Sequence, residues 1–217
     1  MWTWDVWSLD LERGTETPVT SGPETEVYPI WLPSEGSIAY SIDRGSEPQL
    51  FRKDLATGKE EKLIPGAGFF QWAQDVSPDG RSLVYMEASE HGRFDVWALP
   101  LTGGRKPVAF LQAPFNKRDV RFSPDGRYLA MITTESGQPE VYVTAYPGPG
   151  ERIRVSTGGA QGLRWKVIRG AAERDSQLDF LQSGQNQVKP ERVFSGKPAR
   201  QEILLRIVEV QLGLHTG

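Results

Sequence analysis

The chain has 217 residues, enough for one large domain or two small ones, and its 38% hydrophobic and 24% charged residues are ordinary for a globular protein. A net charge of -3 gives no sign of a chain built to neutralise phosphates, so we expect no nucleic-acid partner. No apolar run reaches the ~20 residues that cross a bilayer, and the N-terminus lacks the features of a signal peptide. The 23 glycines and 16 prolines favour many turns and short strands.

Four strand-like segments recur along the chain at nearly constant spacing. Each alternates branched or aromatic residues with others, which is typical of a half-buried strand. The segments are Asp5–Leu11, Gln49–Leu55, Asp95–Leu101 and Glu140–Tyr146, and they begin 44, 46 and 45 residues apart. Glycines in the following turns keep the same period, at Gly14, Gly58, Gly104, Gly150 and Gly196. Independent markers with one period predict a repeat protein.

A Ser-Pro-Asp-Gly-Arg turn marks a second position in the repeat. It occurs at 77–81 and again 46 residues later at 123–127, with a degraded copy at 32–36. In such a turn proline presets φ, aspartate caps its own backbone and glycine takes the positive φ. The strands expected in one repeat are 73–77, 82–87, 95–101 and 106–111. Four short strands that recur every ~45 residues are typical of a β-propeller blade.

The predicted fold is therefore an all-β propeller of four-stranded blades, a single propeller segment over residues 1–217 with about four whole repeats and partial ends. The repeats are assigned to 1–25 (partial), 26–66, 67–113, 114–158, 159–206 (degenerate) and 207–217 (partial). The pattern weakens from residue 166, and the apolar stretch 203–212 fits both a helix and a strand. We favour a strand there because the glycine phase persists.

These motifs resemble the TolB-type, WD-like β-propeller repeat family. The Ser-Pro-Asp-Gly-Arg turns, the Asp-Val-Trp strand and the run Phe-Ser-Pro-Asp-Gly-Arg-Tyr-Leu-Ala carry the resemblance, which covers 5–165 well and 166–217 poorly. The stretch 95–165 is most similar to the propeller region of bacterial (Acidobacteria-like) serine/threonine kinases. A more distant similarity is to the propellers that precede prolyl-oligopeptidase-type hydrolase domains. Such motifs are specific for the fold and weak for function.

The residue inventory argues against catalysis within this chain. There is no cysteine, and the only histidines are His91 and His215, so disulfides, thiol nucleophiles and histidine-rich metal sites are excluded. No nucleophile elbow, P-loop, zinc-protease helix or kinase catalytic motif occurs. We expect no cofactor and no metal, and any kinase or hydrolase activity would belong to a domain that this chain lacks.

A partner-binding surface is expected on the loops at one end of the blades. In a propeller the loops from fourth to first strands and from second to third strands share one face, and binding residues gather on such loops. The candidate residues are Phe69, Phe70, Arg93, Phe115, Asn116, Lys117 and Arg118. The phenylalanines would be anchors and the charged residues a rim. In the competing interpretation the phenylalanines fill gaps between blades and the charges are merely solvated.

The functional expectation is a non-catalytic module that binds a protein or small ligand, as the sensory part of a larger bacterial signalling protein such as a serine/threonine kinase. The alternatives are a propeller that gates a prolyl-oligopeptidase-type hydrolase and a truncated fragment without function of its own. We expect the chain to be a fragment of a longer protein, and we favour this interpretation over a ring closed by residues 1–20 and 207–217. An open ring would leave edge strands free to associate with other chains. The resemblance suggests a periplasmic or extracytoplasmic location, which the missing signal peptide opposes.

Overall fold

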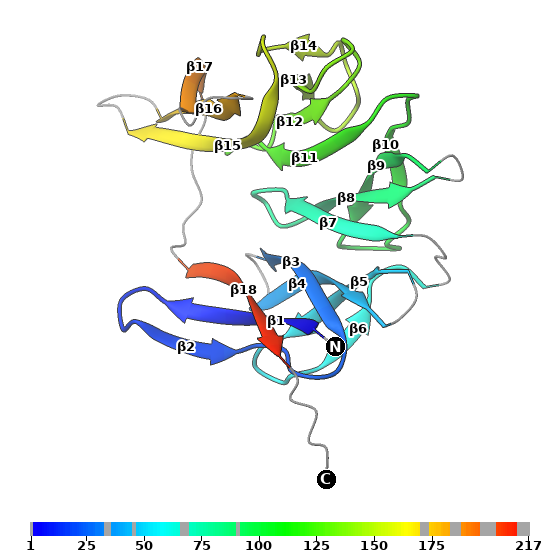
Figure 1. Cartoon of the computed structure of the whole chain (residues 1–217), viewed down its shortest axis with the longest axis vertical. Coiled ribbons are helices and arrows are strands. Elements are labelled where there is room, and N and C mark those ends of the chain that lie inside the picture. The colour runs from blue at the N-terminus through cyan, green and yellow to red at the C-terminus, as the bar shows by residue number, and fades with distance from the viewer. Residues whose placement is uncertain are drawn as a thin grey trace. The chain divides into compact units, whose positions relative to one another are not determined.

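The computed structural model describes residues 2–32, 36–44, 47–65, 70–89, 92–169, 174–182, 188–195 and 203–211, with side chains only between Thr3 and Trp165. These residues form strands and no α-helix (Figure 1). No helix in this part of the chain is therefore long and apolar enough to span a membrane. The chain divides into two compact units, residues 1–73 with 201–217, and residues 74–200.

The first unit joins the two ends of the chain in one sheet of order β18-β1-β2. Strand β1 (Trp2–Asp10) pairs antiparallel with β18 (Ile203–Gln211) along its whole length and with β2 (Thr15–Pro18) on its other side. The strand expected over 203–212 is thus confirmed. Strand β1 therefore lies between one strand from the C-terminal end of the chain and one that directly follows it in sequence.

The other sheet of the first unit is a four-stranded antiparallel meander of order β3-β4-β5-β6. Its strands are β3 (Thr25–Leu32), β4 (Ser37–Asp43), β5 (Gln49–Asp54) and β6 (Glu60–Lys62). Val6 of β1 packs into the same apolar cluster as Ile38, Tyr40, Ile42 and Phe51. Apolar side chains on one face of β1 and of this sheet therefore form one shared core.

The second unit contains two more four-stranded meanders and one three-stranded sheet, with the boundary between the units falling inside β7. The first meander is β7 (Gln71–Val76), β8 (Ser82–Ala88), β9 (Phe94–Pro100) and β10 (Val108–Leu111). The second is β11 (Lys117–Phe122), β12 (Tyr128–Thr133), β13 (Glu140–Ala145) and β14 (Ile153–Arg154). The third sheet is β15 (Ala160–Arg169), β16 (Arg174–Gln182) and β17 (Val188–Ser195). The predicted four-stranded repeat is confirmed.

The two Ser-Pro-Asp-Gly-Arg turns have the same internal hydrogen bonds. Asp79 accepts from the Ser77 hydroxyl at 2.5 Å and from the Arg81 backbone N–H at 3.0 Å. Asp125 is held in the same way by Ser123 at 2.6 Å and Arg127 at 3.1 Å. Glycine takes positive φ in both turns, 72° and 74°. The mechanism predicted for the turn is therefore confirmed at both copies.

Candidate functional site

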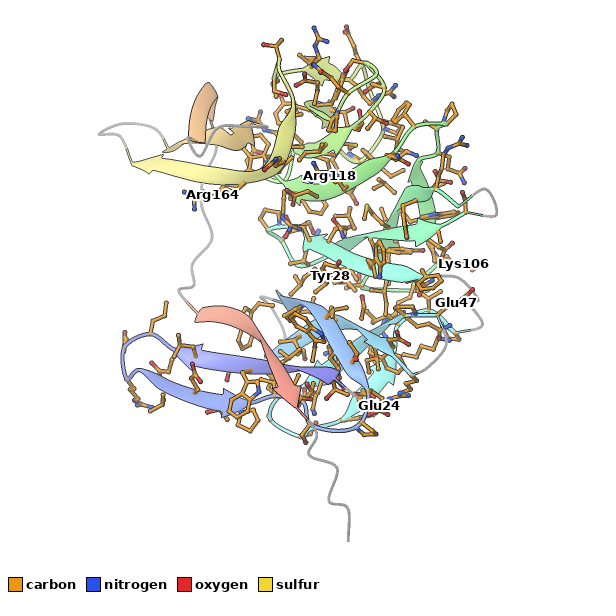
Figure 2. All side chains as sticks on the ribbon, viewed as in Figure 1. Glu24, Tyr28, Glu47, Lys106, Arg118 and Arg164 are labelled. Carbon is orange, nitrogen blue, oxygen red and sulfur yellow. The ribbon has the colours of Figure 1, made fainter. Side chains whose placement is uncertain are left out.

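The candidate residues from the sequence divide between the two units. Phe69 lies outside the described residues, as do His91, His215 and Gly196. Phe70 belongs to the first unit, where its ring lies edge-on to Trp72 with centroids 6.5 Å apart and 39% of the residue is exposed. Trp72 also lies 5.9 Å from the ring of Tyr28, which is labelled in Figure 2. The rings of Tyr28 in β3 and Phe70 just before β7 therefore both contact Trp72 in β7.

Lys117 is the centre of the candidate site in the second unit, although it is buried. Its ammonium group is fully enclosed and contacts Asp95 Oδ1 at 3.0 Å. Three backbone carbonyl oxygens complete the shell, those of Ala113 at 2.8 Å, Phe94 at 3.1 Å and Phe115 at 3.1 Å. A side chain enclosed in this way has no surface to offer a partner, so the charged rim expected from the sequence does not include it.

The contacts of Lys117 bring two loops to the same end of the second unit. Its carbonyl ligands come from the 112–116 loop and from the start of β9, which follows the loop that carries Arg93. Asn116 extends the arrangement by exchanging two hydrogen bonds with Thr134 in the β12–β13 turn, each 3.1 Å long. We call the described residues of these loops, 89, 92–93, 112–118 and 134–139, the loop rim. Arg93 is next in the chain to Phe94, whose carbonyl accepts from Lys117.

The ring of Phe115 interacts with two cations. The Lys117 ammonium is 5.2 Å from its ring centroid and the Arg152 guanidinium is 5.5 Å away. Arg152 is itself paired with Glu135 at 2.8 Å. The attraction of both positive charges to the aromatic ring helps to hold Phe115 in place.

Arg118 ties the loop rim to the strand that follows in the next sheet (Figure 2). Its guanidinium donates to the backbone carbonyls of Gln161 at 2.5 Å and Ala160 at 2.8 Å. Arg93 is exposed, and its backbone carbonyl accepts the Ser89 N–H at 2.6 Å. Within the described part of the chain, the Arg93 side chain has no tie to the backbone of the kind that Arg118 makes.

A second polar cluster, which the sequence reasoning missed, lies on the first strands of the second unit. Asp75 of β7 accepts the Phe122 N–H at 2.7 Å, and Gln74 accepts the Val120 N–H at 3.2 Å. Burial raises the pKa of Asp75 to about 6, against the lowering effect of the Phe122 N–H and of Arg121. These groups connect β7 with β11. They bind backbone N–H groups and do not form a pair of nucleophile and base. The available signal was the number of polar residues in these two first strands, which include Gln71, Gln74 and Asp75 in β7.

The described side chains do not form a metal site. No cluster of three or more histidine, cysteine, aspartate or glutamate residues occurs among them in a geometry suited to an ion. What the geometry offers is a hydrogen-bonded set of loops in which Arg93 and Asn116 are exposed.

Comparison with known sequences points to one kind of protein. No family model matches the chain. It is 28% identical over 123 residues to the Tol-Pal system protein TolB of Wolinella succinogenes, covering 56% of this chain and 28% of that protein. TolB of Helicobacter pylori strain J99 is 27% identical over 135 residues, covering 61% of this chain and 32% of the relative. The chain therefore spans only a part of the curated relatives that it matches.

Solved structures agree on the architecture. TolB from Acinetobacter baumannii superposes with a TM-score of 0.62 over 87% of this chain and 52% of its own length, at 18% identity. The fold is that of a TolB-like β-propeller. Enzymes share it, since a prolyl endopeptidase superposes with a TM-score of 0.56 over 95% of this chain and 31% of its own, at 19% identity. At such identities the likeness to either structure establishes the TolB-like propeller fold alone.

Proposed function

We propose that this TolB-like propeller is a non-catalytic module that binds a protein partner through the loop rim. The observation that supports this best is the bracing of the 112–116 loop and the start of β11, which Lys117 ties to the start of β9 and Asn116 ties to the β12–β13 turn. Loops fixed before binding lose little conformational entropy when a partner arrives. Arg93 and Asn116 would contact the partner, while Lys117 and Phe115 would hold the loop in shape.

The relatives are consistent with such a role, because their names make them components of a Tol-Pal system. The proposal for this chain does not extend to that system's members. It concerns a protein surface with acidic groups able to meet the exposed Arg93 guanidinium.

Site-specific photocrosslinking tests the proposal. A photoreactive residue at position 116 is compared with one at position 106, an exposed lysine on the turn before β10, in extract of the source organism. We expect one discrete protein adduct from position 116, absent from position 106, and lost when Arg93→Glu is added. Equal labelling from both positions, or an adduct that survives Arg93→Glu, would contradict the proposal.

We further propose that the module is the sensory part of a larger bacterial signalling protein such as a serine/threonine kinase. This rests on the resemblance of residues 95–165 to the propellers of such kinases. Sequencing the gene well beyond both ends tests it: kinase motifs and a membrane-spanning stretch upstream would support the proposal. A hydrolase domain with a nucleophile elbow downstream would replace it by the substrate-gating alternative. Kinase and peptidase assays on residues 1–217 are expected to show no activity.

A further inference from the structure

A carboxylate occupies one position of the repeat in three of its four copies, Asp5, Asp95 and Glu140, and Gln49 occupies it in the fourth. In the second unit both carboxylates have hydrogen-bond donors. Asp95, near the start of β9, faces the Lys117 ammonium from the start of β11 at 3.0 Å. One repeat later Glu140 accepts hydrogen bonds from the Ser156 hydroxyl and from the backbone N–H groups of Gly158 and Gly159, at 2.9 and 3.0 Å. The start of β11, and the loop before β15, are thereby each connected with the third strand of the preceding blade.

The corresponding position in the first unit brings two carboxylates together. Asp5 of β1 lies two repeats before Asp95, and Glu26 of β3 lies two repeats before Lys117. Asp5 is only 7% exposed and Glu26 only 5%. Strands β1 and β3 pack against each other, and Asp5 raises the pKa of Glu26 both through its charge and through its side-chain hydrogen bond. An acid therefore stands where the second unit has a lysine.

The neighbouring Thr20 hydroxyl donates to Glu26, so its hydrogen is not available to Asp5. Thr20 Oγ1 accepts the Val6 N–H at 2.8 Å and gives its own hydrogen to Glu26 at 3.1 Å. Among the described residues Asp5 Oδ1 is left without any hydrogen-bond partner. A proton on Glu26 supplies the missing donor, because a protonated carboxyl group can donate to a carboxylate.

The surroundings of Glu26 supply no free cation among the described side chains. Arg44, which like Glu26 acts on Tyr40, is shared between Glu24 at 3.5 Å and Glu60 at 2.7 Å. The titratable groups that act on Glu26 are Asp5 and Glu24. The strands packed against β3 add Asp10 of β1, Tyr40 and Asp43 of β4 and, by backbone register on β18 opposite Trp7 and Trp4, Arg206 and Glu209, while Arg44 and Glu60 act on Tyr40. Burial raises the pKa of Glu26 to about 7, Thr20 lowers it and Asp5 raises it again.

We propose that Asp5 and Glu26 form a proton-dependent latch between β1 and β3, in the sheet that joins the two ends of the chain. With one proton on the pair, Glu26 donates to Asp5 and β1 is held against the β3–β6 blade. Without the proton, two buried negative charges face each other and β1 is loosened.

The direction of the pH effect follows from the raised pKa. An unfolded glutamate ionises near 4.5, whereas Glu26 in the folded chain keeps its proton until the pH approaches 7. Between these values only the unfolded state loses its proton, so the hold on β1 is full below about pH 4.5 and weakens as the pH rises through 7.

Hydrogen exchange of β1 amides in the full chain tests the latch. The neutral variant Glu26→Gln is compared with the wild type at each pH, which cancels the intrinsic pH dependence of exchange, and Glu12→Gln on an exposed turn is the control. We expect the Val6 amide to exchange at similar rates in both proteins at pH 5, and about tenfold or more faster in the wild type at pH 8, because each unit of pKa shift is a factor of ten. A rate ratio that is the same at both pH values would overturn the proposal.

A second variant keeps the test decisive if glutamine is poorly tolerated. Glu26→Lys recreates the Asp95–Lys117 pair of the second unit. It is expected to slow exchange of the Val6 amide at pH 8 below the wild-type rate, and to remove the change between pH 5 and 8. Exchange as fast as in the wild type at pH 8 would show that the facing charges do not control β1.

Discussion

At the scale of single residues, the loop rim depends on one buried cation. Lys117 is 3% exposed, and its ammonium is surrounded by Asp95 and three backbone carbonyls. Taking a charge out of water is costly, and only a complete shell of acceptors offsets that cost. Lysine is needed here because its compact ammonium has three donors that point in different directions, unlike the planar fork of arginine.

Lys117→Met is expected to destabilise the chain by about 3 kcal/mol, since Asp95 and three carbonyls would lose their donor. Chemical denaturation at pH 7 measures this. The matched control is Lys106→Met, the same change at an exposed side chain, which is expected to alter the free energy of unfolding by less than about 0.5 kcal/mol. Equal effects from the two substitutions would mean that the enclosed ammonium contributes no more than a surface charge.

Glycine at the end of the second Ser-Pro-Asp-Gly turn gives another residue-level prediction. Gly126 has φ of 74°, and a Cβ added there would come within 3.3 Å of the Pro78 ring. Gly126→Ala is expected to lower the free energy of unfolding by about 1–2 kcal/mol through the left-handed backbone alone. Gly104→Ala, where φ is not in that region and nothing lies within 4 Å of the new Cβ, should be neutral in the same measurement.

At the scale of the element, Glu140 fixes the loop between β14 and β15. Its carboxylate accepts from Ser156, Gly158 and Gly159, and from the Gln138 amide at 2.7 Å. Burial by itself would raise the pKa of Glu140, but these hydrogen bonds outweigh it and lower the pKa below its ordinary value of 4.5. The stabilisation is therefore present above pH 4.5 and is lost as the pH falls through the lower folded value.

Glu140→Gln is expected to cost about 2 kcal/mol of stability at pH 7, where it replaces a charged acceptor by a neutral one. The difference from the wild type should shrink as the pH is lowered below 4.5. Thermal unfolding across this pH range checks both points, with the exposed Glu151→Gln as control. A difference that stays constant down to pH 3 would exclude the ionised carboxylate as its source.

The elements also show what the sequence could and could not predict. Strands at 82–87 and 95–101 were expected within a residue or two of β8 and β9, because alternation and turn chemistry are local signals. Lys117 was expected on the surface, but its acceptors include Asp95, which is 22 residues away in another strand. Asp75 was missed because its partner, the Phe122 N–H, is 47 residues away. Contacts between blades leave no mark on local pattern beyond the repeat period itself.

At the scale of the whole chain, the two ends meet in one sheet. Strands β1 and β18 pair in a fixed register in which Ser8 lies opposite Leu205 and Leu9 opposite Leu204. Local sequence predicted a strand at each end, but pairing across nearly the full length of the chain is the kind of non-local contact that no short-range pattern reports. A backbone edge that is paired in this way is no longer open to another chain.

A disulfide between the ends tests this pairing directly, because the chain has no cysteine of its own. Residues directly opposite on antiparallel strands have Cα atoms about 4.5–5.5 Å apart, within the range that a disulfide spans. Ser8→Cys with Leu205→Cys is therefore expected to oxidise readily, and to raise the thermal midpoint because the bond closes a loop of almost the whole chain. Leu9→Cys with Leu204→Cys repeats the test one residue along the register.

The mismatched pair, Ser8→Cys with Leu204→Cys, is the control, because a shift of one residue turns the second side chain to the opposite face of the sheet. Oxidised and reduced forms are separated by their mobility on a non-reducing gel. Preferential closure of the matched pairs would establish the register of β1 and β18 in solution. If the mismatched pair closed as readily as the matched ones, the two ends would have to meet without a fixed register, and β1 would depend on β2 and on the Asp5–Glu26 contact for its position.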